Sequence, residues 1–221
     1  AKEGAVGWVR MSYRDNGLLH GEGYQHRDTP KLPGLELTAE DYRRLARLAT
    51  QGDVTLTITS QVKFDDSDPN GYNVLADRPG SDAKAGYVMA GAHLDSWVAA
   101  DGAADNGAGS AVVMEAARIL AALKVKPKRT IRFALWSGEE QGLYGSANYI
   151  ERHFASRPAN PDPVKIRLSY DFKLGEYPIE KKADYNLLAA YFNMDNGGGK
   201  FRVEFKPGKH LAPVGFVAEV G

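Results

Sequence analysis

In the stretch Tyr87-Val-Met-Ala-Gly-Ala-His-Leu-Asp95, an uninterrupted apolar run leads directly into a histidine and a carboxylate. Such runs are typical of strands in a parallel sheet that is covered on both faces. Residues 110–123, rich in alanine and leucine, predict a helix, and Thr130–Trp136 predicts the next strand. A second helix is expected over about 143–153, and Leu187–Phe192 predicts a last strand. Strands that alternate with helices predict an α/β fold with a parallel sheet.

The sequence before this stretch has a different pattern. Residues 5–10 predict a strand, and the stretch from Asn16 to Pro33 predicts a long surface loop. Polar and turn-forming residues crowd Asp65–Gly71, which predicts a linker. Residues 157–184 show no consistent period and are expected to form a loop or an excursion. We therefore expect two domains, 1–64 and 65–221.

A helix and a strand are predicted between that first loop and the linker. Thr38 and Asp41 have the spacing of a capping box, and the helical run that follows stops at Gly52. In Val54-Thr-Leu-Thr-Ile-Thr59 apolar residues alternate with threonines, which is the period of a half-buried strand.

Composition excludes several classes of partner. The 28 basic and 28 acidic residues cancel, and no basic stripe is dense enough to bind a nucleic-acid backbone. No apolar run reaches the roughly 20 residues needed to span a bilayer, and the N-terminus shows no signal-peptide pattern. The chain has no cysteine, so any metal must be held by His, Asp and Glu.

Ligand-type side chains follow each strand of the predicted sheet. In an open α/β sheet, ligands bind outside the carboxyl ends of the strands, so groups far apart in sequence would meet at one edge. Imidazole and carboxylate ligands suit zinc. The side chains placed at this edge are His93, Asp95, Asp105, Glu139, Glu140 and Asp195.

Each of these signals also has a plainer interpretation when taken alone. A single histidine after a strand is usually a hydrogen-bonded structural residue, and Asp105-Asn-Gly and Asp195-Asn-Gly both fit ordinary turns. The Glu139-Glu140 pair also fits a solvated surface. Asp101, which is followed by glycine as well, is a competing candidate for the Asp105 role. We expect no catalytic part for the remaining early and middle histidines, which are His20, His26 and His153.

The motifs His93-Leu-Asp95, Asp105-Asn-Gly107 and Trp136-Ser-Gly-Glu-Glu-Gln-Gly142 resemble the co-catalytic zinc exopeptidase family. That family includes bacterial leucyl aminopeptidases, glutamate carboxypeptidases and the transferrin receptor ectodomain. The short interval between His93 and Asp105 looks most like its plasma glutamate carboxypeptidase (carboxypeptidase Q) branch. Residues 1–60 are similar to the later part of a protease-associated domain. The resemblance implies a mixed, largely parallel sheet flanked by helices.

The resemblance also implies a two-zinc site. His93, Asp105 and Asp195 would hold one zinc, with Asp105 bridging to a second zinc held by Glu140. The family supplies one more histidine to the second zinc, beyond the Asp195 position, whereas this sequence offers only His210, in no matching motif. We therefore expect an incomplete chain whose second position has Glu140 and the bridge alone.

Two further residues receive catalytic roles by the same resemblance. Glu139 would be the general base that takes a proton from metal-bound water, so that hydroxide attacks the peptide carbonyl, and returns it to the leaving amine. Asp95 would accept a hydrogen bond from the second ring nitrogen of His93 and so orient the ring.

The function implied is that of a zinc-dependent exopeptidase, an aminopeptidase or dipeptidase that acts on short peptides. A glutaminyl-cyclase-like single-zinc enzyme and a receptor-like binding module with an inactive site remain alternatives. The same resemblance implies a secreted or periplasmic protein, and a homodimer is kept as a candidate assembly.

Overall fold

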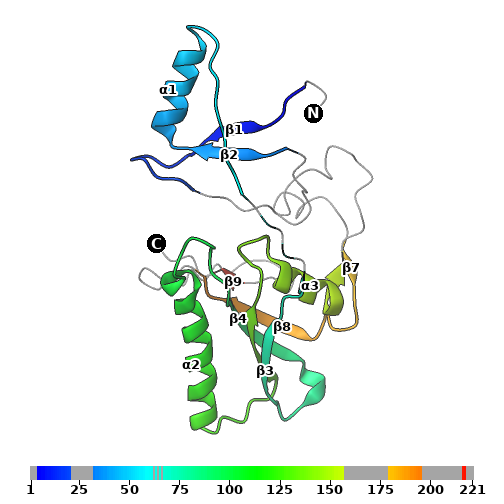
Figure 1. Cartoon of the computed structure of the whole chain (residues 1–221). Helices are drawn as coiled ribbons and strands as arrows, with labels where there is room; N and C mark the ends of the chain where they lie inside the picture. The colour runs from blue at the N-terminus through cyan, green and yellow to red at the C-terminus, as the bar shows by residue number, and fades with distance from the viewer. Residues whose placement is uncertain are drawn as a thin grey trace, which may run out of the picture. The chain divides into compact units, whose positions relative to one another are not determined.

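The computed structural model describes residues 4–20, 32–61, 63, 65, 67–156 and 179–195, and the backbone of 216–217. It divides into two compact units, Ala1–Asn70 and Gly71–Gly221. The division falls inside the segment 65–71 for which the sequence predicts a linker. The helices and strands of each unit are labelled in Figure 1.

The first unit contains a two-stranded parallel sheet and one helix. Strand β1, Trp8–Met11, pairs with β2, Gly34–Leu37, and helix α1, Ala39–Ala49, follows β2 directly. Thr38 caps α1, because its hydroxyl accepts the Asp41 N–H at 3.2 Å and donates to the Asp41 carboxylate at 2.8 Å. The predicted helix and its cap are thus confirmed, whereas β2 was not foreseen.

The strand predicted over residues 54–59 is wrong. Residues 53–60 are not part of any strand, and the side chains of Leu56 and Ile58 are 49% and 52% exposed. Alternation specifies a strand only where a neighbouring strand satisfies the backbone and a core covers the apolar face. No described strand pairs with this segment.

The second unit is built on a five-stranded mixed sheet. Its strand order is β3-β5-β4-β8-β9, and β3 is antiparallel to β5 while the other pairs are parallel. The mixed, largely parallel sheet is confirmed. Its strands are β3, Val74–Arg78; β4, Tyr87–His93; β5, Thr130–Trp136; β8, Leu188–Asn193; and β9, Phe216–Val217.

Helices cover this sheet on two sides (Figure 1). Helix α2, Gly109–Ala122, packs Val113 against Ala92 and Phe133 of β4 and β5. Helix α3, Tyr144–His153, contributes Tyr149 to a separate cluster with Met89 and Trp136. Because side chains of a strand point alternately to opposite faces, these two clusters form the two layers of the core.

Shorter elements complete the second unit. A 3₁₀ turn, η1, spans Ala83–Ala85, and an irregular helical turn, η2, spans Ala103–Ala108 before α2. Strand β6, Ala155–Ser156, pairs with β7, Glu180–Lys181, so part of the expected excursion is ordered. Residues 157–178 lie outside the described residues.

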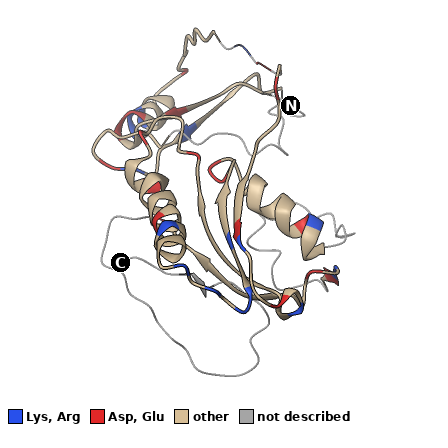
Figure 2. Cartoon of the chain, turned by 90° about the horizontal axis from the view of Figure 1, so that it is seen from below, with Lys and Arg blue, Asp and Glu red and all other residues tan. Residues whose placement is uncertain are grey.

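Charges of both signs lie along the helices of this unit. Figure 2 shows acidic and basic positions close together on α2 and on α3. On α2, Glu115 and Arg118 form two hydrogen bonds of 2.6 Å. In the part of the chain that the structure describes, no helix is long and apolar enough to cross a membrane.

Candidate metal centre

The carboxyl ends of three parallel strands bring the predicted ligands together. His93 is the last residue of β4, β5 ends one residue before the loop that carries Glu139 and Glu140, and Asp195 follows β8 by two residues. Since β4 lies between β5 and β8 with parallel register, all three ends meet at one edge.

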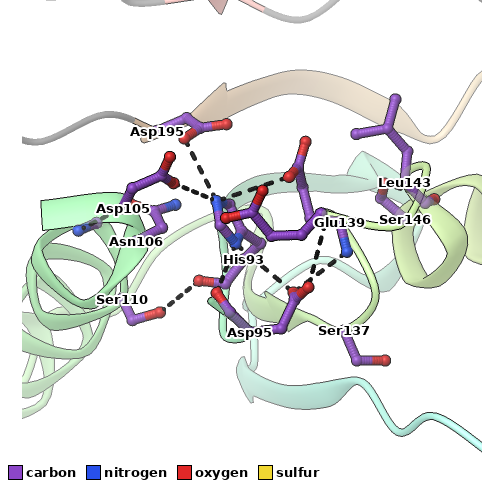
Figure 3. A network of polar contacts seen from close by, with 12 residues as sticks. His93, Asp95, Asp105, Asn106, Ser110, Ser137, Glu139, Leu143, Ser146 and Asp195 are labelled. Atoms are coloured by element: carbon purple, nitrogen blue, oxygen red, sulfur yellow. Dashed lines mark hydrogen bonds and ion pairs between the residues drawn. The ribbon is translucent and has the colours of Figure 1, made fainter. Parts of the chain in front are cut away.

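His93 is the centre of the cluster (Figure 3). Its side chain is 3% exposed, and its Nε2 lies 2.9 Å from Asp105 Oδ1, 3.4 Å from Asp195 Oδ1 and 3.9 Å from Glu139 Oε2. The Ser110 hydroxyl on α2 donates to the His93 carbonyl at 2.8 Å. Ser110 therefore anchors the His93 backbone, and the imidazole faces three carboxylates.

The prediction that the Asp95 carboxylate accepts a hydrogen bond from His93 is wrong, because the acceptor is the Asp95 backbone carbonyl. His93 Nδ1 lies 2.9 Å from the backbone carbonyl of Asp95, while the Asp95 carboxylate is 3.6 Å away. That carboxylate instead accepts the backbone N–H groups of Glu139 and Glu140, both at 3.2 Å. The chain turns so tightly after β4 that the carbonyl reaches the ring first, which leaves the carboxylate free to hold the neighbouring loop.

The crowding of carboxylates changes the proton affinities at the site. Burial, reinforced by Asp195 and Glu140 and opposed by His93, raises the pKa of Glu139 to about 7. Burial and the negative charge of Asp105 raise the pKa of Glu140. Burial acts to lower the pKa of His93, but the charges of Glu139 and Asp195 outweigh it, so that pKa lies above its usual 6.5.

The loop with Glu139 and Glu140 is anchored by Asn73, a residue that sequence reasoning missed. The Asn73 side chain accepts the Ser137 N–H at 3.1 Å and donates to the Gly145 carbonyl at 2.9 Å. A Cβ on Gly145 would lie 2.2 Å from Asn73 Oδ1, so only glycine fits. Asn73 lies 64 residues before Ser137, and no local motif marks it.

Two groups of side chains can each hold a metal ion. One is His93, Asp105 and Asp195, and the other is His93, Glu139 and Glu140, with ligand atoms within 4.8 Å of one another. Glu140 Oε1 is buried without a hydrogen-bond partner, as expected of an oxygen that awaits a cation. The residues therefore fit a dication.

The remaining candidates fall outside these groups. Asp101 belongs to neither group, so the structure favours Asp105 over it. His20 contacts the Tyr13 hydroxyl at 2.8 Å in the first unit, and His153 lies 3.7 Å from Asp184. His26 and His210 lie outside the described residues, so the histidine expected for a second metal position cannot be located among those that are described.

A mixed β-sheet that is flanked by helices and gathers imidazole and carboxylate ligands at its carboxyl edge defines the class of metal-binding α/β domains. Comparison with known families is specific. The sequence profile of peptidase family M28 matches residues 73–206, and the chain belongs to this family.

Individual relatives agree with this assignment. The chain is 38% identical over 136 residues to carboxypeptidase Q of Xenopus laevis. This alignment covers 60% of this chain and 28% of that protein. The chain is 32% identical over 202 residues to leucine aminopeptidase 2 of Trichophyton equinum, covering 91% and 38% respectively. The crystal structure of a peptidase M28 precursor from Shewanella amazonensis SB2B matches with a TM-score of 0.54 and 26% identity, over 91% of this chain and 40% of that one.

The chain thus spans between about a quarter and two fifths of the length of these relatives. The matched part includes the whole described cluster from His93 to Asp195. These findings establish the family and the fold.

Proposed function

We propose that this chain carries the catalytic centre of a zinc-dependent exopeptidase that hydrolyses terminal peptide bonds of short peptides. The observation that carries the proposal is the ligand group of His93, Asp105 and Asp195 at the carboxyl edge of the sheet, with Glu139 and Glu140 beside it. Relatives named as a carboxypeptidase and a leucine aminopeptidase support terminal cleavage.

Zinc suits this donor set, because the chain has no thiolate and presents imidazole and carboxylate. His93, Asp105 and Asp195 would hold one ion, with Asp105 also facing a second position that includes Glu140. A cation in such a site acts as a Lewis acid toward a carbonyl oxygen and lowers the pKa of water. The number of ions remains part of the proposal.

Glu139 is proposed as the general base. Its carboxylate lies at the edge of the cluster, 3.9 Å from His93 Nε2, and its pKa of about 7 matches a group that exchanges protons at neutral pH. Glu139 would accept a proton from the attacking water and deliver it to the leaving amine. Asp95, through the two loop N–H groups, would keep Glu139 and Glu140 in place.

Hydrolysis by the zinc-loaded chain tests the proposal. We expect release of amino acid from a dipeptide, and we expect Glu139→Gln to reduce the rate by at least about a hundredfold while zinc stays bound. The matched control is Glu151→Gln at an exposed position of α3, which should leave the rate unchanged. A chain that binds zinc without turnover would favour the receptor-like alternative, and a chain that binds no zinc would overturn the proposal.

Polarity, location and assembly remain predictions. A free dipeptide compared with its N-acetylated form distinguishes an enzyme that requires a free amino terminus from one that does not. A secreted or periplasmic location and a homodimer rest on the family resemblance alone.

A further inference from the structure

One buried side chain connects the segments that carry two of the proposed ligands. Asn106 directly follows Asp105, is 1% exposed and lies beside the cluster (Figure 3). Its Nδ2 donates to the Met194 carbonyl at 2.8 Å, across 88 positions of sequence. Met194 directly precedes Asp195. The amide of Asn106 therefore ties the chain next to one carboxylate to the chain next to the other.

The backbone of Met194 forms a hydrogen bond through its N–H and another through its carbonyl. Its backbone N–H donates to the Gly91 carbonyl of β4 at 2.9 Å, while its carbonyl accepts from Asn106. Gly91 lies two residues before His93. The three ligands His93, Asp105 and Asp195 thus each lie within two residues of one continuous hydrogen-bonded frame.

The hydrogen-bonded frame around Asn106 is closely packed. Asn106 Oδ1 accepts the Gly109 N–H at 3.1 Å at the start of α2. A Cβ on Gly109 would lie 2.2 Å from that Oδ1 and 2.6 Å from the Met194 carbonyl oxygen, so glycine is required for this approach. Close packing of this kind fixes the Asn106 amide and, through it, the distance between the two ligand segments.

We propose that Asn106 is a positioning residue that fixes the separation of the Asp105 and Asp195 carboxylates around His93 and thereby sets the affinity and geometry of the metal position they form. The inference rests on the proposed metal site. Asn106 would not contact the metal, and it would act through the hydrogen bond that its Nδ2 donates to the Met194 carbonyl.

A plainer role must be separated from this one. Asn106 has non-helical dihedral angles, φ −131° and ψ 37°, and its Oδ1 accepts the N–H three residues later, as a helix N-cap does. Serine and threonine also cap helices, but the hydroxyl of either side chain is too short to donate to the Met194 carbonyl. Both substitutions therefore keep the cap on Gly109 and remove the hydrogen bond to the Met194 carbonyl.

Zinc titration of the 221-residue chain tests the proposal, with Asn106→Ser as the main variant. We expect its zinc affinity to fall by about tenfold or more, as for other groups that orient ligands indirectly, and the absorption spectrum of the Co²⁺-loaded chain to change. Asn148→Ser on α3 is the matched control, because Asn148 Nδ2 also donates to a backbone carbonyl, that of Tyr144 at 2.9 Å, away from the cluster.

Asn106→Thr provides the second variant, and circular dichroism without metal establishes that each variant is folded. If Asn106→Ser does not fold, Asn106→Thr decides alone. Zinc affinity within about twofold of the native chain and an unchanged Co²⁺ spectrum would show that Asn106 is a cap and overturn the inference. The same loss in Asn148→Ser would also overturn it. No zinc binding by the native chain would overturn the proposed function, and this inference with it.

Discussion

At the level of single residues, the crowding of carboxylates around His93 destabilises the metal-free protein. One imidazole faces the carboxylates of Asp105, Asp195 and Glu139 within 3.9 Å. Burial, reinforced by the neighbouring carboxylates Asp195 and Glu140, raises the pKa of Glu139 to about 7, although the adjacent His93 opposes this rise. The charges of Glu139 and Asp195 keep the pKa of His93 above 6.5 in spite of its burial. A dication would relieve this repulsion. Proton release and metal binding should therefore be linked.

We expect the apparent zinc affinity to increase as the pH rises from 6 to 8. At pH 6 both His93 and Glu139 are largely protonated, since each pKa lies above that pH, and zinc must displace the proton on the imidazole. Calorimetric titration in two buffers of different ionisation enthalpy measures the protons released. In Glu139→Gln the dependence should be weaker, because one titrating group is lost and the field on His93 is reduced. An affinity independent of pH over this range would contradict the linkage.

The sequence identifies residue types better than residue contacts. His93, Glu139, Glu140 and Asp195 could be chosen because strand ends in an α/β sheet converge, whereas Asp105, on the loop before α2, was chosen through the family resemblance. The acceptor on His93 Nδ1 could not, because the choice between the carbonyl and the carboxylate of Asp95 depends on a local turn. Asn106 was missed for another reason: its partner Met194 comes from a different strand end.

At the scale of elements, Asp95 joins the end of β4 to the loop between β5 and α3. Its carboxylate accepts two backbone N–H groups of that loop, from Glu139 and Glu140. Asp95→Asn leaves one acceptor and Asp95→Ala leaves none, while the backbone carbonyl still holds His93. Zinc at the His93, Asp105 and Asp195 position should therefore remain bound in both variants.

We expect kcat to fall by about tenfold in Asp95→Asn and by about a hundredfold in Asp95→Ala, because Glu139 loses its fixed position. Steady-state hydrolysis of a dipeptide measures this, and amide hydrogen exchange at residues 139 and 140 should accelerate in the same order. Asp101→Asn is the control, since Asp101 belongs to neither ligand group. Unchanged exchange together with unchanged kcat would remove Asp95 from the positioning role.

Elements with strong local signals could be predicted, and those that depend on partners could not. Helix α1 has its cap at Thr38, and β4 and β5 are long apolar runs, so each was found within a residue or two. The alternating residues 54–59 carry an equally clear strand pattern, yet no described strand pairs with them. Strand β3 was missed because Val74–Arg78 lies at the sheet edge, where its side chains are mostly exposed.

At the scale of the whole molecule, the proposed site depends on the second unit being assembled. Its ligands extend from His93 to Asp195, and Asp195 reaches the cluster only after β8 has paired with β4, where Asn193 lies opposite Gly91. The unfolded chain has no such arrangement. A metal that binds the folded state alone must stabilise it.

We expect zinc at a hundred times its dissociation constant to raise the free energy of unfolding of the second unit by about 2.7 kcal/mol. Trp136 is 5% exposed in the core of that unit, so its fluorescence reports the transition. Trp8→Phe removes the tryptophan of the first unit and leaves Trp97 and Trp136 as reporters. For a unit of this size the melting temperature should rise by about 5–10 °C. The shift should vanish in His93→Ala, which removes the ligand common to both metal groups. A shift that persists in His93→Ala would mean that zinc stabilises the chain from elsewhere, and the centre proposed here would have to be abandoned.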